Sequence, residues 1–74
     1  MTNIEKHKLM YQEYLKANDA FIKAHDELVY DRHSKEWQEF VKSKIELEKI
    51  MVELYHMAKL MQTGALQPND EYKE

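Results

Sequence analysis

Apolar residues recur at alternating spacings of three and four positions from Trp37 to Met61, and the positions opposite them are mostly charged, from Glu39 to His56. This periodicity is typical of an amphipathic α-helix that turns one face toward a core. Further apolar residues flank the stripe and widen it beyond what a single neighbouring helix covers. The pattern predicts a helix over about residues 34–63 that packs against more than one other helix. Its inward positions are predicted to be Trp37, Phe40, Lys44, Leu47, Met51, Leu54, Ala58 and Met61.

A second stripe with the same spacing occupies the first part of the chain. Thr2 and Glu5 have the spacing of a capping box, in which each side chain accepts a hydrogen bond from the backbone N–H of the other residue. We therefore expect a helix over about residues 3–30. Its inward positions are predicted to be Ile4, His7, Tyr11, Tyr14, Asn18, Phe21, His25 and Leu28.

The two stripes cannot belong to one continuous helix, because their spacing falls out of phase between Leu28 and Trp37. Asp31 and Ser34 lie in this interval, and both residue types favour the position just before the first turn of a helix. A short break between two helices of similar length favours an antiparallel pair. The predicted fold is therefore all-α, an antiparallel two-helix hairpin over residues 1–66.

The end of the second helix is marked by Gly64, since glycine commonly follows the last residue of a helix. Beyond it the chain is polar and carries three acidic residues, Asp70, Glu71 and Glu74. This segment has few apolar groups to bury. We therefore expect residues 67–74 to form a flexible acidic tail.

A chain of 74 residues is short for a self-sufficient core, because a domain of that size buries only about 60% of the surface of its unfolded form. With no cysteine there is no disulfide, so oligomerisation remains the natural source of further stability. We expect a homodimer in which two hairpins form a four-helix bundle. The predicted oligomer core consists of Tyr14, Phe21, Trp37, Phe40, Leu47, Met51 and Leu54. The polar seam residues Asn18, His25 and Lys44 serve either the specificity of assembly or a function, and both alternatives stay open.

The chain has 11 basic and 14 acidic residues, and its formal net charge is −3. Most of the imbalance lies near the C-terminus, so the helices are nearly neutral and lack the block of basic charge that binds a phosphate backbone. This argues against nucleic acid as a partner. The sequence also lacks a signal-peptide pattern and any apolar run long enough to span a membrane, so we expect a cytoplasmic protein without a membrane partner.

Candidate catalytic groups are few. The absence of cysteine and the single glycine exclude a thiolate nucleophile and a glycine-rich phosphate-binding loop, and Ser34 and Ser43 have no base at a suitable spacing. Glu53 and His56 match the Glu-x-x-His motif of di-iron four-helix bundles, but they fall on the charged outer stripe, away from a bundle interior. We therefore expect no enzymatic activity, no catalytic residue, no cofactor and no metal site.

The open end of the hairpin, where the first helix begins and the second ends, collects apolar residues that are rich in methionine. Apolar surface of this kind adapts to different protein partners, although the methionines also suit an irregular end of the core. The predicted partner-binding surface consists of Leu9, Met10, Met57, Leu60 and Met61. The expected function is that of a small non-enzymatic protein-interaction module. A regulator, inhibitor, adaptor or assembly factor of bacterial or phage type, acting as a helical-hairpin oligomer, fits these features.

Three alternatives remain at this level. The predicted architecture resembles that of Rop-like RNA-binding hairpin dimers, which implies RNA binding on a basic face, whereas here the outer positions alternate in sign. The segment Ser34-Lys35-Glu36-Trp37-Gln38 resembles the signature of hairpin aspartyl phosphatases, but Gln38 stands where those proteins have Asp. In the third alternative, the hairpin completes a helical bundle with a different protein.

Overall fold

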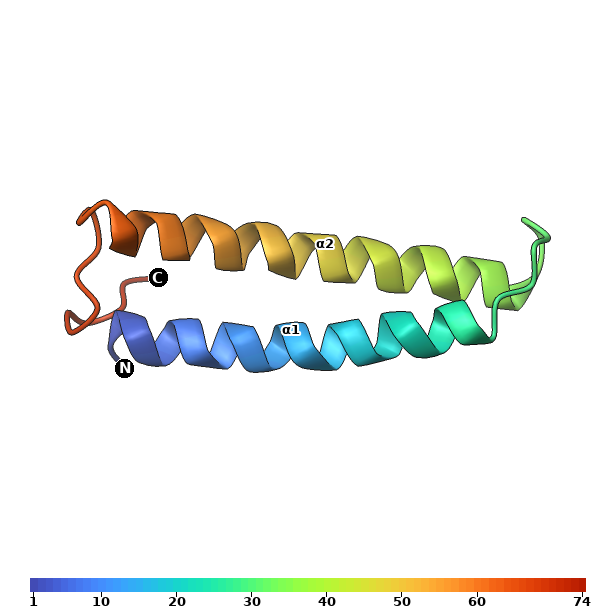
Figure 1. Ribbon diagram of the computed structural model, residues 1–74, viewed down its shortest axis with the longest axis horizontal. Helices are drawn as coiled ribbons and strands as arrows, with labels where there is room; N and C mark the ends of the chain where they lie inside the picture. The colour runs from blue at the N-terminus through green and yellow to red at the C-terminus, as the bar shows by residue number, and fades with distance from the viewer.

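The structure is a computed structural model that describes all 74 residues. It contains two α-helices, α1 (Asn3–Asp26) and α2 (Lys35–Gln62), which lie side by side in antiparallel directions (Figure 1). The molecule is elongated, with extents of 47 × 18 × 16 Å. The all-α two-helix hairpin predicted from the sequence is confirmed.

Side chains cap the first turn of both helices. The hydroxyl of Thr2 accepts a hydrogen bond from the backbone N–H of Glu5 at 3.3 Å, and the backbone N–H of Thr2 donates to Oε1 of Glu5 at 2.9 Å. These bonds complete the predicted capping box. The backbone N–H and the hydroxyl of Thr2 both donate to the carboxylate of Glu5, and they lower the pKa of Glu5 because they stabilise its charged form. At the start of α2, the hydroxyl of Ser34 accepts from the backbone N–H of Trp37 at 3.0 Å.

The connection between the helices is longer than the sequence pattern predicts, because α1 ends at Asp26 rather than near residue 30. Side-chain hydrogen bonds within the connection replace helical ones. The hydroxyl of Ser34 donates to the carbonyl of Asp31 at 2.7 Å, and the carboxylate of Asp31 accepts from the backbone N–H of His33 at 3.0 Å. Serine and aspartate compete in this way with the backbone bonds that would continue a helix.

The hairpin interior is built from different rows of residues than the sequence pattern predicts, although the spacing of three and four is kept. Apart from Trp37, every second predicted position is replaced by the residue just before it, as Tyr11 is by Met10 and Met51 by Ile50. We call the two interior rows the seam. In and just after α1, the seam consists of Asn3, His7, Met10, Tyr14, Ala17, Phe21, Ala24 and Leu28. On α2 it consists of Phe40, Ser43, Leu47, Ile50, Leu54, Met57 and Met61.

Contacts across the seam fix how far the helices are displaced along each other. The ring centroids of Phe21 and Phe40 are 5.3 Å apart. Further along the hairpin, Ala17 lines the same surface hollow as Glu46 and Ile50. Ala17 therefore lies level with the middle of α2.

Few side chains are enclosed by the two helices alone. Met10, Leu47 and Met57 are the buried hydrophobic residues, between 5% and 9% exposed. Within the predicted oligomer core, Leu47 is buried and Met51 is 46% exposed, while the half-buried members are Tyr14, Phe21, Trp37, Phe40 and Leu54. A single hairpin therefore leaves much of its apolar surface in contact with water.

The C-terminal segment is docked against the start of α1, where the sequence pattern predicts a flexible tail. The backbone N–H groups of Asn3 and Ile4 donate to the carbonyls of Asp70 and Pro68, both at 2.9 Å. The side chain of Asn3, a residue only 2% exposed, donates to the carbonyl of Gln67 at 2.8 Å. The first N–H groups of a helix have no partner inside the helix, so the carbonyls of the tail take the place of water there.

Further contacts hold the end of the tail. The backbone N–H of Tyr72 donates to the carbonyl of Met1 at 2.8 Å, and Nζ of Lys6 lies 5.2 Å from the centroid of the Tyr72 ring, within cation–π range. Gly64 makes the return possible, because its φ of 83° is a left-handed conformation that ends α2. The C-terminal end thus lies beside the first turn of α1 (Figure 1).

Removing residues 67–74 is expected to lower the melting temperature by more than about 5 °C, which corresponds to about 1 kcal/mol in a chain of this size. The deletion removes the partners of the Asn3 side chain and of the N–H groups of Asn3 and Ile4. Deleting only Lys73 and Glu74, which make no hydrogen bond, is the matched control and should leave the melting temperature unchanged. Thermal melting followed by circular dichroism measures both. Equal melting temperatures for the full chain and the longer deletion would show that tail docking adds no stability.

Candidate functional site: the apolar face of the hairpin

Helical geometry divides the surface outside the seam into two faces. Each residue turns the helix by about 100°, so residues that directly follow seam residues lie on one side of the seam and residues that directly precede them lie on the other. Because α1 and α2 are antiparallel, the following residues of both helices share one face of the hairpin. In the same way, the preceding residues of both helices share the opposite face. Ala20 and Lys23 of α1 line one hollow there together with Glu39 and Lys42 of α2. All four of these residues precede seam residues.

One face of the hairpin is largely apolar and uncovered. The exposed large apolar residues that follow seam residues, which we call the apolar face, are Tyr11, Leu15 and Ile22 on α1 and Val41, Met51 and Tyr55 on α2. Their exposed fractions range from 36% for Val41 to 69% for Tyr55. Ile45 and Val52 adjoin this face on the outer side of α2 and are 61% and 68% exposed. Exposed apolar surface of this extent is typical of interaction sites.

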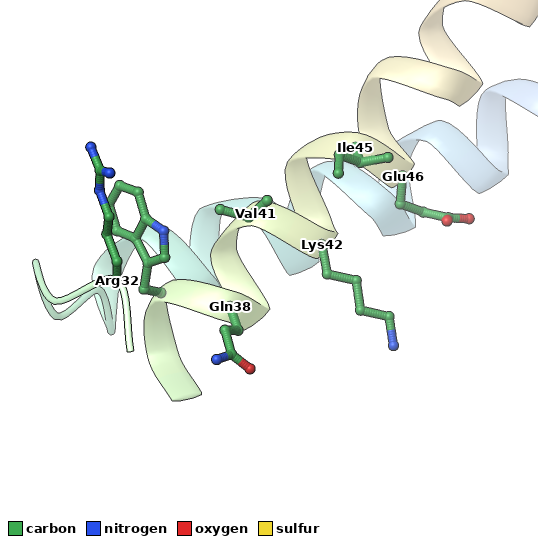
Figure 2. Close-up of a pocket in the computed structure, with 7 residues that line it drawn as sticks. Arg32, Gln38, Val41, Lys42, Ile45 and Glu46 are labelled. Atoms are coloured by element: carbon green, nitrogen blue, oxygen red, sulfur yellow. The ribbon is translucent and has the colours of Figure 1, made fainter. Parts of the chain in front are cut away.

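Near the interhelical connection, the apolar face continues into a shallow hollow of about 480 Å³ on α2. Its lining residues are Arg32, Trp37, Gln38, Val41, Lys42, Ile45 and Glu46. Figure 2 shows Val41 and Ile45 along one edge of α2, whereas Gln38 and Lys42 extend away from them. Small-molecule sites instead have polar groups that converge within a deep cleft. The hollow therefore lies on the outer side of α2, with Val41 and Ile45 at its apolar edge and Lys42 and Glu46 at its charged edge.

Polar residues that follow seam residues interrupt the apolar face, and they are Lys8 and Gln62 near the open end of the hairpin and Asn18, His25, Lys44 and Glu48 further along it. Asn18 is half-buried and His25 is exposed, with its ring centroid 6.0 Å from that of Phe40. Lys44 and Glu48 lie on α2 with Nζ and Oε1 4.0 Å apart, and their side chains are 57% and 62% exposed. The structure therefore brings Asn18, His25 and Lys44, which the sequence pattern distributes along the seam, onto one face together with Glu48.

The opposite face, which we call the charged face, is formed by the residues that precede the seam. These are Lys6, Leu9, Glu13, Lys16, Ala20 and Lys23 on α1 and Glu39, Lys42, Glu46, Lys49, Glu53, His56 and Leu60 on α2. Positive and negative side chains are mixed along both helices. Glu53 and His56 of the Glu-x-x-His motif lie here and are exposed, and no group of three or more His, Asp or Glu side chains in the protein is placed to hold a metal ion.

The residues of the predicted partner-binding surface are separated in the structure. Met10 and Met57 lie in the seam and are only 9% and 5% exposed, so a partner cannot reach them while the hairpin is closed. Leu9 is 43% exposed and Leu60 is half-buried, and both lie on the charged face, while Met61 is half-buried in the seam. A hollow of about 350 Å³ opens beside Leu60, with residues of the docked tail in its wall.

The sequence pattern located the residues of the apolar face without separating them from the seam. It predicts that Tyr11 and Met51 face inward, and in the structure they are 49% and 46% exposed. Leu15, Ile22 and Val41 appear in the sequence only as flanking positions. The signal for an uncovered face was the width of the apolar arc, which exceeds what one neighbouring helix covers.

The two serine hydroxyls are engaged with the backbone. Ser34 donates to the carbonyl of Asp31 at 2.7 Å, and Ser43 donates to the carbonyl of Phe40 at 2.8 Å. Each hydroxyl proton is thereby directed to a carbonyl oxygen, whereas a serine nucleophile hydrogen bonds to a general base.

Neither helix combines the length and the apolar content that a membrane-crossing segment requires. Comparisons of the chain with protein-family models, with curated proteins and with solved structures found no match. The functional interpretation therefore rests on the surface of the hairpin itself.

Proposed function

We propose that this protein is a small non-enzymatic protein-interaction module, of the regulator, inhibitor, adaptor or assembly-factor type, that works as a homodimer. Two hairpins pack through their apolar faces and form a four-helix bundle. The observation that carries the proposal is the apolar face itself, whose six residues are 36% to 69% exposed. Covering such a surface with a second helix pair removes apolar area from water, which is the main driving force of association.

The total accessible surface area of the hairpin supports a partner of the size of a second hairpin. Monomeric globular proteins of 9.0 kDa have an accessible surface of about 4,900 Å², whereas the hairpin exposes 5983 Å². The excess of about 1,100 Å² is comparable with the area of about 800 Å² that each partner buries in a stable complex. One further hairpin is therefore enough to cover it.

The distribution of charge supports the same arrangement. Nearly all charged residues of the helices lie outside the apolar face, so face-to-face pairing leaves them in water and avoids the desolvation that burial imposes on ions. The pair formed by Lys35 and Glu39, with Nζ and Oε1 3.8 Å apart, is an example that stays exposed. Because both serine hydroxyls donate to backbone carbonyls, the structure also offers support for a non-catalytic role.

RNA binding of the Rop-like type has less support. Glu13, Glu39 and Glu46 line hollows on the charged face, and their carboxylates repel a phosphate backbone. A dimer built through the apolar faces presents this same mixed surface on both of its sides. No basic surface large enough for RNA results from the pairing.

The charged faces stay accessible in the dimer and provide the surface for a different protein. Leu9 and Leu60 are the only large apolar residues on that face, and both lie at the open end of the hairpin. A partner protein would therefore place its apolar contacts near these two residues and its polar contacts along the lysine and glutamate side chains.

Leu15→Glu is expected to dissociate the dimer, and Leu9→Glu is the matched control. Both leucines belong to α1 and both are 43% exposed, but Leu15 lies on the apolar face and Leu9 on the charged face. A carboxylate at position 15 is buried in both copies without a partner, which costs at least about 3 kcal/mol and weakens association more than 100-fold.

Light scattering at micromolar concentration measures the outcome, and circular dichroism reports helix content. The native protein and Leu9→Glu should have twice the 9.0 kDa mass of one chain, and Leu15→Glu should have the mass of one. A well-folded native monomer, or a Leu15→Glu variant that remains dimeric, would contradict the proposal.

A further inference from the structure

The polar residues near the middle of the apolar face set a condition on any second copy that covers it. Because Ala17 shares a hollow with Glu46 and Ile50, the next residue, Asn18, lies across from the middle of α2. Lys44 and Glu48 lie on either side of that level. Within the hairpin each of these two ions has only the other as a charged partner, with Nζ and Oε1 4.0 Å apart, and burying such a pair is costly unless further partners replace the lost water, so a second copy that places opposite charges near both of them is favoured.

Two symmetric arrangements bring the apolar faces of two copies together. If the two-fold axis runs along the helices, both interhelical connections lie at the same end and α1 packs on α2 of the second copy. If the axis runs across the helices, the connections lie at opposite ends and each helix packs on its own counterpart. Both interfaces use the same surface twice, as a two-fold axis requires.

With the axis along the helices, Lys44 and Glu48 pack against α1 of the second copy. The residues of the apolar face at that level of α1 are Leu15, Asn18 and Ile22. None of them carries a charge. Both ions would then be covered by apolar side chains and one amide, with only each other as charged partners, which makes this arrangement unfavourable.

With the axis across the helices at the level of Asn18, residues of α2 at equal distances on either side of Glu46 meet across the interface. These pairs are Lys44 with Glu48, Val41 with Met51 and Trp37 with Tyr55. Opposite charges meet each other and apolar residues meet apolar residues, all from one position of the axis. On α1 the same axis places Asn18 against Asn18 of the second copy and Leu15 close to Ile22.

We infer that the dimer is antiparallel, with its two-fold axis across the helices at Asn18 and with Lys44 of each copy paired to Glu48 of the other. This inference rests on the proposed dimer and adds its orientation and register. The reciprocal ion pairs and the paired asparagines then select the partner, because an apolar face without the matching charges buries the Lys44–Glu48 pair and gives it no further charged partner.

The first experiment locates the axis with single cysteines, since the chain has none of its own. Two cysteines form a disulfide when their Cα atoms lie within about 7 Å. Asn18→Cys is expected to become a disulfide-linked dimer under mild oxidation at least about 10-fold faster than Ile22→Cys. The two copies of Ile22 are separated by about 12 Å along the helix axis in the inferred register.

Light scattering under reducing conditions first verifies that both cysteine variants are dimeric. Equal and slow cross-linking of the two variants in a dimeric protein would overturn the inferred axis while leaving the dimer itself in place. A native protein that is monomeric would instead overturn the proposed function. The two failures are thus distinguishable.

The second experiment tests the ion pairs by exchanging charges. Lys44→Glu and Glu48→Lys each place like charges opposite one another in a homodimer, and each should weaken self-association about 10-fold or more. Mixing the two variants restores opposite charges at both contacts, so heterodimers should form in preference to either homodimer. Native mass spectrometry of the mixture, with one variant isotopically labelled, measures the three species.

Lys35→Glu mixed with Glu39→Lys is the matched control. These residues form an exposed ion pair at the same i, i+4 spacing but lie outside the apolar face, and the changes in net charge are identical. A preference for heterodimers in the Lys44 and Glu48 mixture that exceeds the control supports the inference. No excess over the control, in variants that still dimerise, would overturn it.

Discussion

Two helices packed side by side can cover only one stripe of each other's surface, and this limit governs the rest of the structure. An apolar arc wider than that stripe stays in water until a further helix covers it. Met10 and Met57 lie on the covered stripe and are almost fully enclosed, whereas Ile22 and Tyr55 lie one row away and are 49% and 69% exposed. The hairpin alone therefore encloses only part of its apolar residues, and in the proposed dimer the second copy covers the apolar face.

At each end of the hairpin, the first N–H groups of a helix have no hydrogen-bond partner inside that helix, and other parts of the chain supply one. At the start of α1, Asn3 is the most buried residue of the protein, yet it is polar, because carbonyls of the docked tail satisfy both its backbone and its side-chain donors. At the start of α2, a serine hydroxyl performs the equivalent task for Trp37. The docked tail thereby closes the end of the hairpin where no interhelical connection is present.

The separation of apolar and charged residues onto opposite faces links the fold to its proposed role. Each residue directly after the seam lies on the apolar face and each residue directly before it lies on the charged face, so a place one position before or after the seam decides which face a side chain joins. Lys44 and Glu48 are the exception on the apolar part of α2. Charges at such a position weaken an interface compared with apolar residues, and their benefit lies in orientation and partner choice.

The helices, their caps and the antiparallel hairpin were predictable from the sequence, because they depend on interactions between residues no more than a few positions apart. The capping box links Thr2 to Glu5, three positions further along the chain, and the apolar period identifies each helix without reference to the other.

The choice between neighbouring rows was not predictable, because Met10 and Tyr11, like Ile50 and Met51, are both apolar and fit the same spacing. Docking of the tail was not predictable for a different reason, since its hydrogen bonds join Asn3 to Gln67 and Asp70 at the far end of the chain. Only the packed helices bring these backbone groups together, and so only the tertiary structure decided which apolar row is enclosed, which is left uncovered, and where the acidic tail lies.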